Sequence, residues 1–543
     1  MAGQITQPIM VVDPSKEHVR EKDALQMNIT AAMAVSNMVK STFGPSGMDK
    51  MLVDVAGDIT ITNDGETILR KIAVEHPSAK TIVAVANTQE KEVGDGTTAS
   101  VMFAGELLKK AGGLLERGIH PTTVITGYKL AEQKSQEILG ELATDVAEDD
   151  TDLLQSIAAT AMVGKAIACD NLAPICVRAI QLIKNGDIDV FNNVRIQQSV
   201  GKGIEDTELI TGIVIDKRRV HDAMPKRVKD AHIALLTSGI EFRKFAKAPG
   251  GKSNEKMKVT SALQLEEMYA GEESAIKSDV DSLYNIGVNA VFCTQSITES
   301  AQGYLVKRGI LGVARVNDND LEAISRATGA TILSNIVDVE ESDLGTAGTV
   351  EEKGAEDEEL IYIKDCSDPK AVSIVVHGGT EHVLDTVEGA IGDALRVVAD
   401  VVKANTVVAG GGACEAELSL HLREYARTIG GKEQLAVDAF ADALETLPRT
   451  LAENAGLDST DMMTLLKAKH IAGGRTSGID VYNGDIIDMY ENGVIEPLQV
   501  KTQSLKSATD ATVMILKVDD VLASERKELA PAPGQAPRDY DRF

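Results

Sequence analysis

The run Gly94-Asp95-Gly96-Thr97-Thr98 has the composition of an anion-binding turn at the start of a helix. Glycine lets backbone approach a ligand closely, and the free N–H groups of a helix's first turn, with the positive end of its dipole, attract anions. Thr97 is placed to cap this helix. Asp95 would repel a phosphate unless a cation lay between them, so the run predicts phosphate together with Mg²⁺. The alternative is an ordinary glycine-rich turn, because short motifs often match by chance.

Three further charged residues lie at positions where a loop or helix could present them to a ligand. Asp64 follows the strand pattern 59–62 and precedes a helical pattern, so it is predicted on a strand-to-helix turn. Gly164 and Lys165 end a loop of small residues, and Asp393 lies on a helix, off its apolar stripe. Taken singly, these residues have ordinary alternatives: a turn aspartate, a solvated lysine and a solvated helix face.

Two familiar nucleotide motifs do not apply to this chain. The run 94–99 fits the pattern G-x-G-x-x-A, but charged residues 88–92 precede it where a buried strand is required. Gly251-Lys252-Ser253 resembles the end of a P-loop, but Ala246 stands where its first glycine belongs. A different glycine-rich segment, Gly410-Gly411-Gly412, follows the predicted strand 407–409 and could let backbone meet a ligand.

The elements that would carry these residues change in type along the chain. Helical patterns dominate up to about residue 185, short strands alternate with helices to about 379, and helices then return. Both ends of the chain are rich in helical patterns that the middle lacks, which predicts one domain split by an insertion. The strands predicted are 59–62, 187–191, 209–216, 226–236, 290–293, 407–409, 480–482, 486–489 and 494–495, and a lysine-rich stretch precedes a predicted helix at 262–286.

The amino-acid composition argues against several kinds of binding partner. The 543 residues are 43% hydrophobic and 25% charged, as in soluble globular proteins of more than one domain. Lys and Arg number 55 and Asp and Glu 83, so the formal charge is −28, which argues against nucleic acid and anionic membranes as partners. Aromatic residues are only 3%, which disfavours an RNA reader built on stacking.

No segment of the sequence is typical of a membrane span or a signal peptide, and we expect a cytoplasmic protein. The five cysteines lack a C-x-x-C pair, so they predict neither a disulfide framework nor a zinc site. We expect them to be small buried side chains in a reducing compartment.

Taken together, the motifs resemble those of group II chaperonin subunits of the archaeal thermosome type. The matching runs, in chain order, are Gly44-Pro45-x-Gly47-Met48-Asp49-Lys50, Thr62-Asn63-Asp64-Gly65, Val93–Thr98, Gly410–Gly412, Leu451–Gly456 and Glu491–Leu498. The resemblance extends from about residue 5 to 525. Several ordered motifs far apart in the chain are specific, although no single one would be.

The resemblance implies a multidomain α and α/β chaperonin fold. Residues 1–148 and 404–525 would form a helical equatorial domain that binds ATP, and 149–217 with 370–403 a small α/β intermediate domain. Residues 218–369 would form an α/β apical domain whose helical protrusion, at about 241–285, serves as a built-in lid. Residues 526–543 would be a disordered tail.

The resemblance also implies the roles of individual residues around ATP and Mg²⁺. Asp95 would hold Mg²⁺, Asp64 and Asp393 would orient the attacking water, with Asp393 as general base, and Lys165 would contact the γ-phosphate. The remaining contacts implied are Gly44, Pro45, Gly94, Gly96, Thr97, Thr98 and Gly164 around the phosphates and Gly411, Asn483 and Glu496 at the adenosine end.

The function implied is that of an ATP-dependent chaperone that encloses unfolded polypeptide. Like or sister subunits would form two stacked rings, expected to hold eight subunits each, and ATP hydrolysis would close the lid. Two other classes stay open at this point: a metabolic ATPase or kinase acting as a small oligomer, and a passive holdase without turnover. The set Asp64, Asp95 and Asp393 argues against the holdase, and nothing marks a second small-molecule site.

Overall fold

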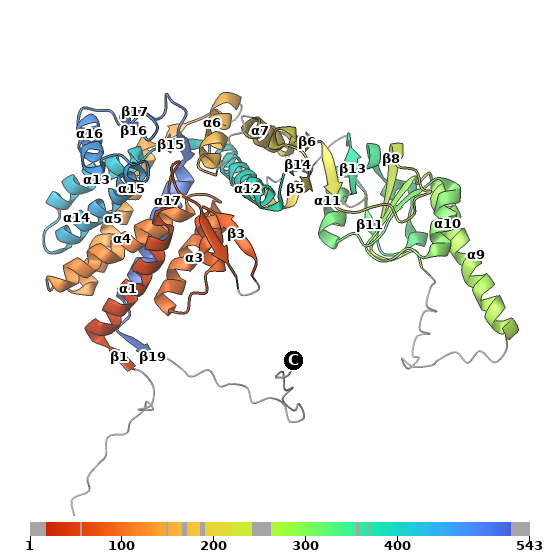
Figure 1. Ribbon diagram of the computed structural model, residues 1–543, viewed down its shortest axis with the longest axis horizontal. Coiled ribbons are helices and arrows are strands. Elements are labelled where there is room, and N and C mark those ends of the chain that lie inside the picture. The colour runs from red at the N-terminus through yellow and green to blue at the C-terminus, as the bar shows by residue number, and fades with distance from the viewer. Residues whose placement is uncertain are drawn as a thin grey trace, which may run out of the picture.

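The computed structural model describes residues 18–54, 57–147, 150–165, 171–184, 190–241, 262–354, 359–366 and 370–522. Figure 1 shows three bodies in a row: a helical body, a middle body and a body built on a large sheet. The chain enters and leaves through the helical body, where β1 (His18–Arg20) pairs antiparallel with β19 (Asp520–Leu522).

The helical body is built from both ends of the chain. Its helices are α1 (Glu21–Lys40), α2 (Gly65–Lys71), α3 (Pro77–Glu92), α4 (Thr97–Glu116), α5 (Pro121–Leu142), α13 (Ala413–Thr428), α14 (Glu433–Leu444), α15 (Thr446–Asn454), α16 (Ser459–Ile471) and α17 (Leu498–Leu516). At the centre of their common core, Phe440 packs edge-on against Phe103 at 5.2 Å and Tyr128 at 5.8 Å between ring centroids. Apolar burial between the first and last segments therefore stabilises this body.

Short strands border the helical body. The antiparallel pairs are β2 (Lys50–Val53) with β3 (Ile59–Thr62) and β16 (Ser477–Asp480) with β17 (Asp485–Asp488). A three-stranded sheet has β15 (Thr406–Ala409) between β18 (Ile495–Pro497) and β4 (Thr144–Asp145). These strands lead directly into the loops that carry the sequence motifs.

The middle body packs helices on a three-stranded sheet. In the sheet, β14 (Val372–Gly378) lies parallel to β5 (Val194–Val200) and antiparallel to β6 (Glu208–Ile210). Its helices are α6 (Thr151–Met162), α7 (Leu172–Ile183), α8 (Val190–Asn193) and α12 (Glu381–Ala404). The apolar stripe predicted on α12, including Leu384, Val387 and Ile391, is buried in this core.

Within the described residues, the sheet body has seven strands, in the order β10-β9-β8-β12-β13-β7 with β11 pairing β8. They are β7 (Gly212–Ile215), β8 (Arg227–Leu236), β9 (Ala290–Cys293), β10 (Leu311–Val313), β11 (Ile332–Leu333), β12 (Gly345–Lys353) and β13 (Leu360–Lys364). Side chains alternate between the faces of β8. Ile233 and Leu235 pack in the core with α11 (Asp318–Thr328), whereas Ala234 and Leu236 pack in the core with α9 (Ala262–Ile286) and α10 (Glu299–Arg308).

Most predicted elements are found, and the mixed α and α/β fold is confirmed, but three strand predictions are wrong, one of them 480–482, because β16 ends at Asp480 and 481–484 form a turn. Residues 190–191 belong to the short helix α8, and 187–189 lie outside the described residues. The predicted strand 209–216 is broken at Thr211, so that β6 joins the middle sheet and β7 the large one. Gly212, with φ +142°, permits the break, since a Cβ there would lie 2.0 Å from the carbonyl oxygen of Ile363.

Other predictions concern ends, insertions and cysteines. The helix predicted at 262–286 is α9, which projects from the sheet body (Figure 1). The lysine-rich stretch 241–258, apart from its first residue, and the tail lie outside the described residues. Cys176, Cys293, Cys366 and Cys414 are buried free thiols, and Cys169 lies outside the described part. Among the helices described, none combines the length and the apolar character that a membrane span requires.

Candidate active site

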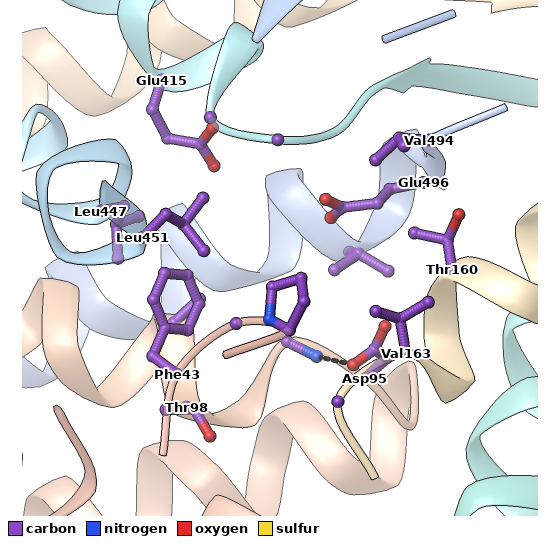
Figure 2. A pocket seen from close by; sticks show the side chains of 18 of the residues that line it. Phe43, Asp95, Thr98, Thr160, Val163, Glu415, Leu447, Leu451, Val494 and Glu496 are labelled. Atoms are coloured by element: carbon purple, nitrogen blue, oxygen red, sulfur yellow. Dashed lines mark hydrogen bonds between the residues drawn. The ribbon is translucent and has the colours of Figure 1, made fainter. Parts of the chain in front are cut away.

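A cavity of about 330 Å³ gathers most of the predicted site residues from seven separate chain segments. Figure 2 shows Asp95, Thr160, Val163 and Glu496 on one side of it and Phe43, Leu447, Leu451 and Glu415 on the other. Mixed apolar and polar linings of this size are typical of small-molecule sites. The predicted residues that line the cavity are Gly44, Pro45, Asp64, Asp95, Gly96, Thr97, Thr98, Gly164, Lys165, Asp393, Gly411 and Glu496.

The N-terminus of α4 opens onto this cavity without a side-chain cap. Gly96 is the N-cap, in the left-handed conformation at φ +75°, and Thr97 is the first helical residue, so the prediction that Thr97 caps the helix is wrong. The Gly96 N–H donates to Asp95 Oδ1 at 2.6 Å, drawn as a dashed line in Figure 2. The side chain of Gln89 holds the turn by donating to the Asp95 carbonyl at 2.8 Å. The first turn of α4 therefore presents a positive helix end to the cavity.

Two loops close over this helix end and touch each other. A Cβ at Gly164 would lie 3.0 Å from the carbonyl oxygen of Gly44, and a Cβ at Gly44 would lie 2.4 Å from Leu451 Cδ2. Both glycines have positive φ, at +91° and +85°. Asn63 donates from its side-chain amide to the Gly164 carbonyl and ties the second loop to the strand-to-helix turn. Only glycine fits these approaches, so the glycines shape the cavity wall.

Asp64 occupies the predicted turn and caps α2. Its Oδ2 accepts the Thr67 N–H at 2.8 Å, and its own N–H donates to Thr62 Oγ1 at 3.1 Å. The cap holds the carboxylate in one orientation at the wall of the cavity. The second carboxylate oxygen is then the atom of Asp64 that could act on a ligand.

Lys165 and Asp393 form an ion pair at the cavity wall, and both side chains are largely shielded from solvent. The pair joins the loop after α6 to α12, with side chains 15% and 14% exposed. Burial opposes the positive charge of Lys165, but Asp393 and Asp64 outweigh it and raise the Lys165 pKa. Burial raises the pKa of Asp393, while Lys165 opposes that shift. The ammonium therefore keeps a shielded carboxylate charged.

Asp95 is a partly buried carboxylate close to other acidic side chains, an environment in which a bound cation would stabilise its charge. Burial raises its pKa to about 7, with Asp393 and then Glu496 adding to the shift and Lys165 opposing it. No group of three acidic, histidine or cysteine side chains among the described residues could hold a metal unaided. A magnesium ion held by one carboxylate and by the oxygens of a bound phosphate fits this arrangement, because Mg²⁺ commonly takes one or two protein ligands beside phosphate.

The far end of the cavity is organised by a lysine between two carboxylates. Lys501 Nζ lies 2.8 Å from Glu496 Oε2 and 2.9 Å from Glu415 Oε1. Burial alone would lower the Lys501 pKa, but Glu415 and Glu496 raise it well above its usual range. Lys501 thereby fixes the direction in which Glu496 faces the cavity.

The comparisons with known proteins agree over nearly the whole chain. The TCP-1/cpn60 chaperonin family matches residues 35–526. The chain is 48% identical to a thermosome subunit of Methanopyrus kandleri over 522 residues, 95% of each chain. It is 48% identical to thermosome subunit beta of Archaeoglobus fulgidus, covering 97% of each, and 47% identical to thermosome subunit alpha of Halobacterium salinarum, covering 96% of this chain and 93% of that one.

The chain belongs to the TCP-1/cpn60 chaperonin family. The predicted resemblance to group II chaperonins is thereby confirmed, and with it an ATP-dependent chaperone function and ATPase activity. A metabolic kinase and a passive holdase, the two classes left open by the sequence, do not fit this family.

Two residues of this chaperonin predicted to contact nucleotide do not line the cavity. Asn483 is exposed and turns its amide to Asp480 Oδ2 at 2.7 Å, and Asp480 lines the cavity in its place. Gly94 lies behind the wall, where a Cβ would be 2.2 Å from Arg396 Cδ. Asn483 stands three residues beyond the end of a strand, where the turn direction decides which side chain faces inward.

The residues that line the chaperonin's cavity but were not predicted include Asn63, Glu415, Asp480 and Lys501. Asn63 and Glu415 could have been found, since each lies beside a motif residue, next to Asp64 and three residues after Gly412. Lys501 could not, because its role depends on Glu415, which lies 86 residues earlier in the chain.

Proposed function

We propose that this chaperonin subunit binds ATP with Mg²⁺ in the cavity and uses hydrolysis to close a built-in lid over unfolded polypeptide, in the cytoplasm. The observation that carries the proposal is the uncapped N-terminus of α4 facing the Lys165–Asp393 pair. The N-terminus of a helix attracts phosphate, and a carboxylate held opposite it can accept a proton from a water molecule that attacks the terminal phosphate.

The residue roles follow from charge and position. The α4 end and the glycine loops at Gly44 and Gly164 would hold the phosphates, and Asp95 would hold Mg²⁺, which offsets phosphate charge. Asp393 would accept the proton of the attacking water and Asp64 would orient that water. Burial raises the Asp393 pKa, which improves a carboxylate as a base.

Lys165 would link the phosphate to the base. In the structure its ammonium neutralises Asp393, and a γ-phosphate would compete for the same charge. Phosphate binding would then draw Lys165 away from Asp393 and leave the carboxylate more basic. Gly411 and Glu496 would line the adenosine end, with Asp480 in the place predicted for Asn483.

The domain and ring arrangement completes the proposal. The helical body would be the equatorial domain (1–148, 404–525), the middle body the intermediate domain (149–217, 370–403) and the sheet body the apical domain (218–369). Since Asp393 lies on α12 of the middle body, its approach to the phosphate would move the other two bodies relative to each other. Two rings of eight chains of 57.7 kDa would weigh about 900 kDa.

The test is phosphate release by Asp393→Asn, which keeps the side-chain shape but cannot accept the proton. We expect ATP binding close to that of the wild type and turnover reduced about 100-fold or more. Asp385→Asn, an exposed aspartate on the same helix, serves as the control and should hydrolyse ATP normally. Equal loss of binding and turnover in Asp393→Asn would remove the assigned role, and a light-scattering mass of one or two chains would remove the ring.

A further inference from the structure

The contact of α12 with α3 is made by charged side chains. The apolar stripe of α12 is buried in the core of the middle body, so apolar packing does not fix how its polar side faces α3. Asp393 and Arg396 are three residues apart and lie on the same side of the helix. Arg396 forms an ion pair with Glu90 of α3, and the two side chains are 21% and 22% exposed.

We propose that Arg396 and Glu90 form a positioning pair that docks α12 against α3 and so holds Asp393 at the cavity. The proposal rests on the proposed function of Asp393 and adds to it two residues that touch no ligand. Neither residue lines the cavity. The apolar residues of α3 and of α12 lie in different cores, so an ion pair shielded to this degree favours one orientation and one distance between the two helices.

The close packing of Gly94 against Arg396 supports a specific contact between α12 and the segment before α4. Gly94, with φ +79°, lies against the aliphatic part of Arg396: a Cβ there would be 2.2 Å from its Cδ and 2.8 Å from its Cβ. Any larger residue at position 94 would push the arginine, and α12 with it, away from α3. The first glycine of the phosphate-binding run thus serves the docking of α12, which explains why it lies outside the cavity.

The electrostatics couple the pair to the catalytic carboxylate. Burial raises the pKa of Glu90 to about 7, Asp393 adds to this shift, and Arg396 opposes it. Arg396 also opposes the rise in the pKa of Asp393. The guanidinium therefore stands between two carboxylates that repel each other, and its loss would weaken the contact of α12 with α3.

The experiment is a double-mutant cycle on the assembled full-length protein with Arg396→Gln, Glu90→Gln and the double variant. We expect each single change to lower kcat for ATP about 10–100-fold, the cost of a small misplacement of a catalytic group, with the ATP Kd unchanged within a few-fold. The double variant should lose no more than Arg396→Gln alone, because both changes remove the same contact. Arg396→Lys, which keeps the charge, should recover part of the rate.

The control is Lys110→Gln, which removes a helix-to-helix ion pair with Asp442 inside the helical body and should keep the wild-type kcat. Wild-type kcat in Arg396→Gln, or losses that multiply in the double variant, would overturn the positioning pair. A fall in melting temperature together with equal losses in kcat and ATP affinity would also overturn it, since that is general destabilisation. Full turnover by Asp393→Asn would instead remove the proposed function itself, so the two failures are distinguishable.

Discussion

Lys165→Met tests whether the central ion pair is the reason that Asp393 stays charged. Methionine keeps a side chain of similar length and removes the ammonium. Removing one partner of a shielded pair costs about 3–5 kcal/mol while the other stays charged, and the exposures of 15% and 14% favour the lower end, about 3 kcal/mol. Asp393 can limit this cost by taking up a proton, because burial already raises its pKa and loss of Lys165 raises it further.

The pH dependence has a definite sign. A carboxyl group whose pKa in the folded state lies above its unfolded value contributes stability at low pH that is lost as the pH rises through the folded pKa. The difference between wild type and Lys165→Met should therefore be smallest at acidic pH and grow as the pH rises, by up to about 1.4 kcal/mol per pH unit. Calorimetry without nucleotide would measure the shift in melting temperature.

The double variant Lys165→Met/Asp393→Asn is the decisive comparison. Removing both partners leaves no unpaired charge, so it should melt well above Lys165→Met at pH 8.5 and show little pH dependence. If the single and double variants melt together at every pH, the ion pair does not control the charge of Asp393 and the reasoning is refuted.

Three other predictions concern the metal, the helix end and the core. With the Asp95 pKa at about 7, Mg²⁺ affinity in the presence of a non-hydrolysed ATP analogue should be about tenfold weaker at pH 6 than at pH 8. Titration calorimetry of Asp95→Asn should show weak binding without this added dependence. Gly96→Ala should cost about 1–2 kcal/mol and weaken ATP binding, since φ is +75° and its Cβ would lie 2.8 Å from Val500 Cγ1; Gly113→Ala, in open space on the same helix, should not destabilise. Phe440→Ala should cost about 3–5 kcal/mol by thermal melting, because it empties the contact between the two chain ends, and a loss below 1 kcal/mol would contradict that account.

Much of the site was predictable because its parts are local. The uncapped end of α4, the turn at Asp64 and the glycine loops are each set by a few neighbouring residues whose conformational preferences act within one turn. The family resemblance supplied what no single motif could, since it joined segments several hundred residues apart. It also predicted ligand contacts for Asn483 and Gly94, which are not among the residues that line the cavity.

By itself the sequence determined most of the order of helices and strands, the split of the helical body between the two chain ends and many of the residues that line the cavity. Only the tertiary structure decided that Lys165 neutralises Asp393, that Lys501 joins Glu415 to Glu496 and that Arg396 rests on Gly94 beside Glu90. The physical reason is that helical and strand patterns come from neighbouring residues, whereas these contacts join residues far apart in the chain, 228 positions for Lys165 and Asp393. Their charges and pKa values depend on which side chains folding brings together and how far it excludes water from them.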